Sequence, residues 1–272
     1  MSNRKILPSF IICLLAQSAG GAFAQDVPKP LAKLGGYQLV FHDDFDNLDL
    51  SPDSHGKHVW YEGVWFNKHH VPLSSISASG GMLTLTWNRG QDQVDTSITT
   101  LSHDTKNFRA WKYGYFEARM KWDQVNGAWP AFWLIPVQDA NRTDLYNGVR
   151  ESGEVDILEG QGDHPHNIYT TVHDWVNGKD SANRNNVVKL PGDADLGQFH
   201  TYGLLWTPGK LVWYFDGKEV HSENAAPIFD QQDYYMVISM QEASHWKSGD
   251  LSGVTATSMN LTVDWVRVWQ QK

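Results

Sequence analysis

The chain is built from short runs in which apolar and polar residues alternate, separated by segments rich in glycine, asparagine and aspartate. Alternation with a period of two is typical of strands that are buried on one face. We expect strands over residues 37–45, 59–65, 82–87, 96–101, 114–122, 131–135, 153–159, 167–175, 201–206, 211–215, 234–240 and 261–269. Asp216-Gly217 predicts a tight hairpin turn between Tyr214-Phe215 and Glu219-Val220. Helical periodicity extends over no more than a turn or two, so the sequence predicts an all-β fold, a two-sheet sandwich or jelly roll.

The first residues predict a secretory signal rather than part of this fold. Arg4 and Lys5 precede an apolar run over residues 6–15, and small residues follow as far as Ala24. This order is typical of a signal peptide, and the apolar run is too short to span a bilayer. We therefore expect a signal peptide over 1–24, a short leader over 25–36, one domain over 37–272, and a secreted or periplasmic location.

Composition narrows the range of partners. The only cysteine, Cys13, lies within the predicted signal, so we expect a mature domain without disulfides. The formal net charge is −9, and it becomes more negative when Arg4 and Lys5 are removed. This charge argues against nucleic acid and anionic membranes as partners. The 13 tryptophans exceed what a core needs, and exposed indoles suit either stacking on sugars or a protein interface.

One stretch, residues 153–160, concentrates acidic side chains on a predicted strand. Glu154 and Asp156 share a face because side chains two apart on a strand point the same way. Glu159 joins them only if a β-bulge near Ile157 adds one residue. Glycoside hydrolysis uses such a group, with one carboxylate as nucleophile and one carboxyl as proton donor, about 5–5.5 Å apart in retaining enzymes. From the spacing alone, a solvated acidic strand or a cation site explains the pattern equally well.

Taken with its neighbours, the acidic strand resembles glycoside hydrolase family 16. The resemblance rests on ordered blocks at 113–121, 127–134, 154–159, 172–173 and 263–268, with an opening strand at 39–46. The extra residue in the acidic strand is similar to the bulged branch of that family, which includes laminarinases, agarases and carrageenases. The resemblance implies a jelly roll whose concave sheet holds a polysaccharide groove, and a retaining mechanism by double displacement. The domain over 37–272 would then be the catalytic domain.

The resemblance also assigns roles within the acidic strand. Glu154 matches the nucleophile, Glu159 matches the acid/base, and Asp156 matches the residue that assists between them. The physical task of Asp156 would be to share a proton or hydrogen bond and keep the pKa values of the two glutamates apart. His173 matches a histidine on the neighbouring strand that could bond a catalytic carboxylate. No cofactor is expected for catalysis.

Other positions are expected to bind sugar or a structural ion. Trp129 and Trp133 lie four apart on an extended segment, hence on one face, where they would stack against sugars or fill the core. The resemblance places Gln241 and Trp246 where the family frames its groove. Weaker groove candidates are Trp65, Trp111 and Trp175. Asp44 and Asp264 match positions that hold a structural Ca²⁺ in many relatives, the alternative being an acidic turn and an edge aspartate.

The polymer itself stays open at this point. Laminarinases carry an Asn-x-Glu-x-Gln segment where this chain reads Trp-Phe-Asn-Lys-His-His-Val-Pro over residues 65–72, whereas residues 129–133 resemble glucanases. We expect an endo-acting hydrolase of β-1,3- or β-1,3/1,4-glucan. The alternatives are an agar- or carrageenan-type galactan hydrolase, a transglycosylase on the same site, and a sugar-binding sandwich without catalysis. We expect a monomer.

Overall fold

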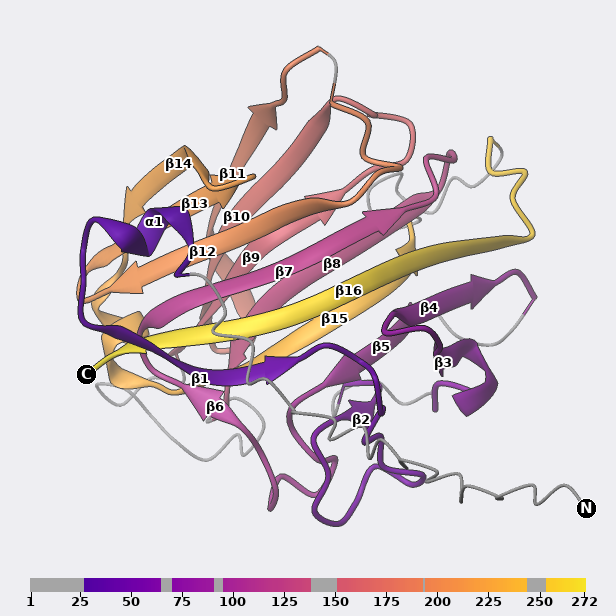
Figure 1. Ribbon diagram of the computed structural model, residues 1–272, viewed down its shortest axis with the longest axis horizontal. Coiled ribbons are helices and arrows are strands. Elements are labelled where there is room, and N and C mark those ends of the chain that lie inside the picture. The colour runs from indigo at the N-terminus through magenta and orange to yellow at the C-terminus, as the bar shows by residue number, and fades with distance from the viewer. Residues whose placement is uncertain (1–26, 65–69, 91–94, 138–150, 193, 244–252) are drawn as a thin grey trace, which may run out of the picture.

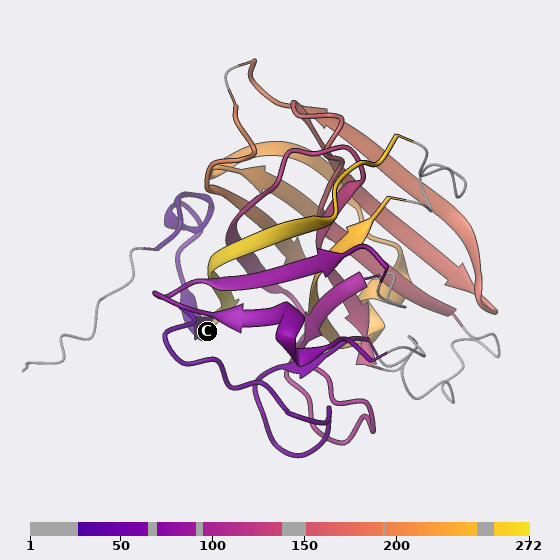
Figure 2. The same ribbon diagram turned by 90° about the vertical axis from the view of Figure 1, so that its right-hand side faces the viewer.

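The computed structural model describes residues 27–64, 70–90, 95–137, 151–192, 194–243 and 253–272, and nearly all of its regular secondary structure is strand. The predicted signal peptide, Trp65 and Trp246 lie outside the described residues. The strands form two antiparallel sheets stacked face to face, as Figures 1 and 2 show from two sides. The all-β prediction and the sandwich are confirmed.

Each sheet contains eight strands. In spatial order, the first sheet comprises β14 (Lys218–Asn224), β13 (Lys210–Phe215), β12 (His200–Thr207), β7 (Gly114–Trp122), β16 (Ser258–Gln271), β4 (Leu83–Asn88) and β3 (Ile76–Ala78), with β1 (Tyr37–Asp43) also paired to β16. The second sheet comprises, in the same sense, β11 (Lys179–Lys189), β10 (Asn167–Val176), β9 (Glu151–Gly160), β8 (Ala128–Pro136), β15 (Tyr234–Glu242), β5 (Asp95–Thr99) and β2 (Tyr61–Glu62), with β6 (Ala110–Trp111) also paired to β15. The short helices are α1 (Lys29–Ala32), η1 (Leu73–Ser75) and η2 (Pro227–Gln231).

The main hydrophobic core fills the space between the two sheets. Side chains alternate along each strand, so every second residue of β4 is buried and its neighbours are partly exposed. Phe116 on β7 and Phe132 on β8 contribute fully buried rings from opposite sheets, and Trp206 and Trp213 add two buried indoles. This aromatic layer makes both sheets a rigid support for side chains on their outer faces.

Two dipeptide turns set hairpins in register. Asp216 and Gly217 both have positive φ (48° and 70°), as a two-residue type I′ turn requires, and they join β13 to β14 as predicted. Asn177 and Gly178 do the same (51° and 76°) between β10 and β11. The sequence analysis did not include β11, because its residues are polar on both faces. It forms nevertheless as an edge strand, since this turn and the backbone of β10 pair it along its length.

The other differences concern short strands and strand ends. The strand expected over 59–65 shortens to β2, while β8 and β9 extend beyond their expected bounds. β3 and β6 contain only 3 and 2 residues, too few for a period-two pattern to be recognised. Pairing with a neighbour, rather than local sequence, decides these boundaries.

The segment before β1 packs against the domain. In α1, Leu31 is fully buried against Tyr115, Leu205 and Trp269 on the outer face of the first sheet. Figure 1 shows α1 in indigo beside β13 and β14. The expected leader over 25–36 therefore contributes a core residue, although the few apolar residues of this short segment form no pattern that predicts its burial. Within the described ranges, the helices are all too short or too polar to cross a bilayer.

Candidate active site

A β-bulge in β9 brings the acidic side chains together, as the sequence analysis expects. Two steps along β10, from Tyr169 to Thr171, pair with three steps along β9, from Glu159 to Asp156. One residue of β9 is therefore extra, and the side chains beyond it change face. Glu159 returns to the outer face of the second sheet, where it lines the same groove as Glu154.

The groove has a volume of about 490 Å³ and crosses four neighbouring strands, β8 to β11. Its lining residues are Trp129, Glu154, Glu159, Thr171, His173, Asn183 and Asn185. They combine one indole, two carboxyl groups, one imidazole, one hydroxyl and two amides. No lysine or arginine belongs to this lining, among the residues that the structure describes. The groove therefore suits a neutral, hydroxyl-rich ligand that offers a face for stacking.

Glu154 is held by a neighbouring indole. Trp175 Nε1 donates a hydrogen bond to Glu154 Oε2 at 2.8 Å, which leaves the other carboxylate oxygen available to the groove. Burial raises the pKa of Glu154, and the nearby charge of Asp156 raises it further. The His173 cation and the Trp175 hydrogen bond act in the opposite direction and favour the carboxylate. Trp175, a weaker groove candidate in the sequence analysis, thus contacts the predicted nucleophile.

His173 links Asp156 to a fourth carboxylate. Its Nε2 lies 3.3 Å from Asp156 Oδ2, and its Nδ1 lies 2.8 Å from Asp180 Oδ2. Burial opposes the charge on the imidazole, but its two aspartate partners and Glu154 outweigh burial and raise the pKa of His173 to about 10. The imidazole is therefore a cation at neutral pH, and it offsets part of the negative charge in the groove. The predicted contact of His173 with an acidic-strand carboxylate is present, and that carboxylate is Asp156.

Glu159 sits between two hydrogen-bond donors. Trp129 Nε1 donates to Oε1 at 3.0 Å, and the Thr171 hydroxyl donates to Oε2 at 2.9 Å. Asn185 in turn donates to the Thr171 hydroxyl at 3.0 Å, which orients it. Burial raises the pKa of Glu159 to about 7, against the lowering effect of these two donors. A carboxyl with this pKa is able to give a proton and take it back near neutral pH.

The remaining candidate sugar-binding residues in the described part of the chain lie outside the groove lining. Trp133 donates to Ser239 Oγ at 3.3 Å, and Gln241 Nε2 donates to the same oxygen at 3.1 Å. Trp133 lies on β8, next to β9, and Gln241 lies on β15, one strand farther away, but neither belongs to the groove lining. Trp111 is buried and packs against Phe41 with ring centroids 5.3 Å apart, so its assignment as a groove candidate was wrong. A two-residue strand conceals which way its side chains point, which explains the error.

Sequence reasoning missed the contribution of β11. Asp180, Asn183 and Asn185 all reach the groove residues from this strand. A signal for them exists in the chain, because Asn177-Gly178 is a strong hairpin dipeptide directly before them. Once β11 is placed beside β10, positions 183 and 185 fall on one face of it.

The residues expected to bind calcium do not fit a cation site. Asp44 is paired with Arg267 at 3.2 Å, and Asp264 is paired with Arg119. A guanidinium already occupies the position at each carboxylate that a divalent ion would take, and Arg267 also lies against the Trp265 ring. The two aspartates belong to none of the three-ligand clusters found among the described residues. The calcium site stays a prediction, and this geometry does not favour it.

Comparison with known proteins points to one family. Residues 64–267 match the sequence profile of Glycosyl hydrolases family 16. The chain is 29% identical over 228 residues to the endo-1,3-1,4-beta-glycanase ExsH of Rhizobium meliloti, covering 74% of this chain and 45% of that protein. It is 28% identical over 297 residues to the kappa-carrageenase of Pseudoalteromonas carrageenovora, covering 97% of this chain and 72% of that protein. The chain thus spans less than half the length of the first of these relatives.

The fold has close matches among solved structures. The catalytic domain of an endo-1,3-beta-glucanase (laminarinase) from Thermotoga petrophila superposes with a TM-score of 0.69 at 22% identity. The match covers 87% of this chain and 98% of that domain. At this level of identity the likeness concerns the fold, and it agrees with a jelly roll of two antiparallel sheets.

Proposed function

Because the chain belongs to glycosyl hydrolase family 16, we propose that it is an endo-acting β-glycanase that retains the configuration of the anomeric carbon. The observation that carries this proposal is the bulge in β9, which presents Glu154 and Glu159 to one groove with Asp156 between them in the chain. The proposed enzyme uses these three carboxyl groups and no cofactor.

In the first step, a carboxylate oxygen of Glu154 attacks the anomeric carbon and forms a glycosyl ester. The glycosidic C–O bond breaks, and the leaving oxygen takes a proton from Glu159. The Trp175 N–H holds the Glu154 carboxylate in place at 2.8 Å. A pKa of about 7 allows Glu159 to carry the required proton near neutral pH.

In the second step, the Glu159 carboxylate takes a proton from water, and the water oxygen attacks the anomeric carbon. The bond to Glu154 breaks, which regenerates both side chains and gives net retention. Asp156 and His173 help the buried Glu154 to remain ionised during this cycle. A proton on Asp156, or its pairing with the His173 cation at 3.3 Å, reduces the repulsion that would otherwise keep Glu154 protonated.

The proposed substrate is a neutral β-1,3- or β-1,3/1,4-glucan. Glucose units carry no charge, and the groove lining offers an indole for stacking and asparagine amides for hydroxyl groups. A sulfated sugar would face two carboxyl groups, and the His173 cation of the described lining is already paired with Asp156 and Asp180. The second candidate is a galactan, because the alignment with the kappa-carrageenase covers 97% of this chain.

The test distinguishes the nucleophile from the acid/base by substituting each glutamate in turn. Glu154→Gln removes the nucleophile, and we expect it to lower kcat by at least about 10³-fold on glucan and on an aryl glycoside alike. Glu159→Gln removes the acid, and we expect a loss of about 10²–10⁴-fold on glucan. With an aryl glycoside whose leaving group needs no proton, ester formation should stay fast in Glu159→Gln, and the glycosyl-protein should accumulate in mass spectra.

Near-normal glucan cleavage by either variant would contradict the assigned mechanism. A panel of β-glucans, agars and carrageenans, read by product mass, identifies the polymer, and products longer than the starting oligosaccharide would indicate transglycosylation. Binding without cleavage of any polymer would favour a sugar-binding sandwich. The proposal includes export, since the sequence predicts a signal that ends at Ala24, and the mass of the processed chain checks this boundary. The proposed oligomeric state is a monomer.

A further inference from the structure

A second cluster of potential ligands lies at the opposite edge of the second sheet from β11. Glu62 on β2, His70 and His103 each place one ligand atom within 4.8 Å of the others. His70 Nδ1 lies 2.7 Å from Glu62 Oε1, and the two imidazole rings are stacked with centroids 6.0 Å apart. Three strands, β5, β15 and β8, separate β2 from the acidic strand β9. At about 4.8 Å per strand, β2 is roughly 19 Å from β9.

The cluster contains a buried carboxylate and an imidazole nitrogen that has no partner among the described residues. Glu62 is 3% exposed, so a carboxylate is buried at a sheet edge. Val71 N–H donates to its Oε2 at 2.8 Å and leaves Oε1 directed at the histidines. His103 Nε2 is buried and has no hydrogen-bond partner among the described residues. A buried imidazole nitrogen without a partner costs free energy unless an ion or water satisfies it.

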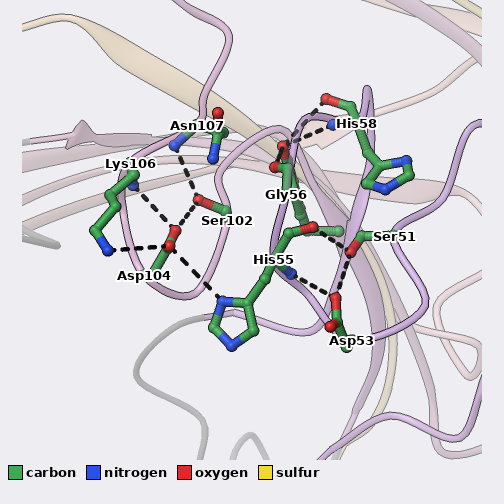
Figure 3. Close-up of polar contacts among 10 residues, drawn as sticks. Ser51, Asp53, His55, Gly56, His58, Ser102, Asp104, Lys106 and Asn107 are labelled. Atoms are coloured by element: carbon green, nitrogen blue, oxygen red, sulfur yellow. Dashed lines mark hydrogen bonds and ion pairs between the residues drawn. The ribbon is translucent and has the colours of Figure 1, made fainter.

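The supporting loops hold the backbones of Glu62 and His103 relative to one another. Ser54 bonds both of them, because its carbonyl accepts from His103 N–H and its hydroxyl donates to the Glu62 carbonyl, each at 3.0 Å. Figure 3 shows the polar contacts of the two loops involved, at residues 51–58 and 102–107. The turn after β5 is closed by Ser102, Asp104 and Asn107, and His55 of the facing loop lies against Asp104. His103 thus projects from a turn fixed on both sides, which is the preorganisation that a ligand site needs.

We propose that Glu62, His70 and His103 bind a zinc ion. Two imidazoles and one carboxylate are a donor set that Zn²⁺ accepts, with a fourth position left for water. His70 supplies the open side, since its side chain is 79% exposed. Zinc bonds of about 2 Å require the Glu62–His70 hydrogen bond to open, and the exposed His70 ring is free to turn. The ion joins β2, the segment at His70 and the turn after β5 into one unit.

The test uses the full chain, stripped with chelator and titrated with zinc chloride. We expect one equivalent of zinc to bind, measured by calorimetry and by metal analysis after dialysis. At free zinc about 100 times Kd, the Tm should rise by roughly 5–10 °C. Magnesium and calcium should leave the Tm unchanged, because these ions prefer sites made of oxygen ligands alone.

Variants locate the site. His103→Ala and His70→Gln should each lose stoichiometric binding and the Tm shift, whereas His58→Gln, in the adjoining loop and paired with Asp49, should keep both. His70→Gln changes an exposed side chain and decides the matter if His103→Ala fails to fold by circular dichroism. Absence of bound zinc in the unmodified protein, or full binding by His70→Gln, would overturn the proposal. Loss of binding in His173→Gln alone would also overturn it, by placing the ion in the groove.

Discussion

At the residue scale, the groove holds carboxyl groups that burial pushes toward the neutral form. Burial raises the pKa values of Glu154, Asp156 and Glu159 into the region of about 7 to 8. Neighbouring carboxylates also repel one another, so the group binds and releases protons as a unit. His173 is the main opposing charge, and Asp180 on β11 holds the imidazole from its other side. The groove therefore stores a proton next to a carboxylate, which double displacement requires.

A substitution at Thr171 tests how hydrogen bonding offsets the effect of burial on the pKa of Glu159. Its hydroxyl donates to ionised Glu159 and so lowers the pKa of that carboxyl. In Thr171→Val the carboxylate loses this donor, its pKa rises, and the acid stays protonated to higher pH. We expect the alkaline limb of the kcat/KM profile to move up by about one pH unit, since a hydrogen bond to a charged group contributes on that scale. Thr171→Ser should restore the original profile.

Thr170 supplies the control for that measurement. It is the neighbouring threonine on β10, it is buried on the other face, and its hydroxyl has no partner among the described residues. Thr170→Val should therefore leave the pH profile in place. An alkaline limb that Thr171→Val does not shift would show that Glu159 is not the group titrating there.

At the element scale, β9 depends on glycine where it crosses the core. A Cβ at Gly153 would come within 2.5 Å of Tyr234 Oη and would overlap the Phe229 ring. The strand can lie this close to both aromatic rings only because residue 153 has no side chain. The position is thus constrained by packing directly beside Glu154, which ties the shape of the acidic strand to the core beneath it.

Gly153→Ala should accordingly destabilise the protein by about 1–3 kcal/mol, as overpacking of a filled core does. Urea unfolding measures the change through the transition midpoint. The matched substitution is Gly192→Ala, because that glycine has ordinary φ and nothing within 4 Å of its added Cβ. We expect Gly192→Ala to stay within about 0.5 kcal/mol of the parent. Equal effects of the two substitutions would rule out the steric explanation.

At the scale of the whole molecule, the outer faces of the two sheets have different roles. The second sheet presents the groove, while the first sheet is covered in part by α1. Leu31 fills an apolar site formed by β7, β12 and β16 on the side of the sandwich opposite the acidic strand. The segment before β1 therefore serves stability, and it is separated from the groove by the full thickness of the core.

Leu31→Ala should lower the free energy of unfolding by about 2–5 kcal/mol, the usual range for a buried leucine. Leu34→Ala removes the same atoms from a side chain that is 55% exposed, and it should cost less than about 0.5 kcal/mol. Both variants should keep the parent kcat on glucan at a temperature where they are folded. A stability loss shared equally by the two would mean that α1 does not dock on the sheet in solution.

The sequence by itself determined the sandwich, most strand positions and the acidic strand, whereas the bulge was a condition in the spacing argument and was indicated by the resemblance to family 16. These depend on local patterns, because alternation within one strand and the spacing of Glu154, Asp156 and Glu159 are visible without knowing any neighbour. The Asp216-Gly217 hairpin was predicted for the same reason, through backbone angles that its two residues favour.

Only the tertiary structure decided what surrounds those three acids. The polar strand β11 forms because β10 pairs with it, and with it come Asp180 and the asparagines of the groove. The burial of Leu31 and the cluster of Glu62, His70 and His103 likewise arise between segments far apart in the chain. Such contacts depend on which backbones lie side by side, and hydrogen bonding between strands carries no local signature in the side chains that it brings together.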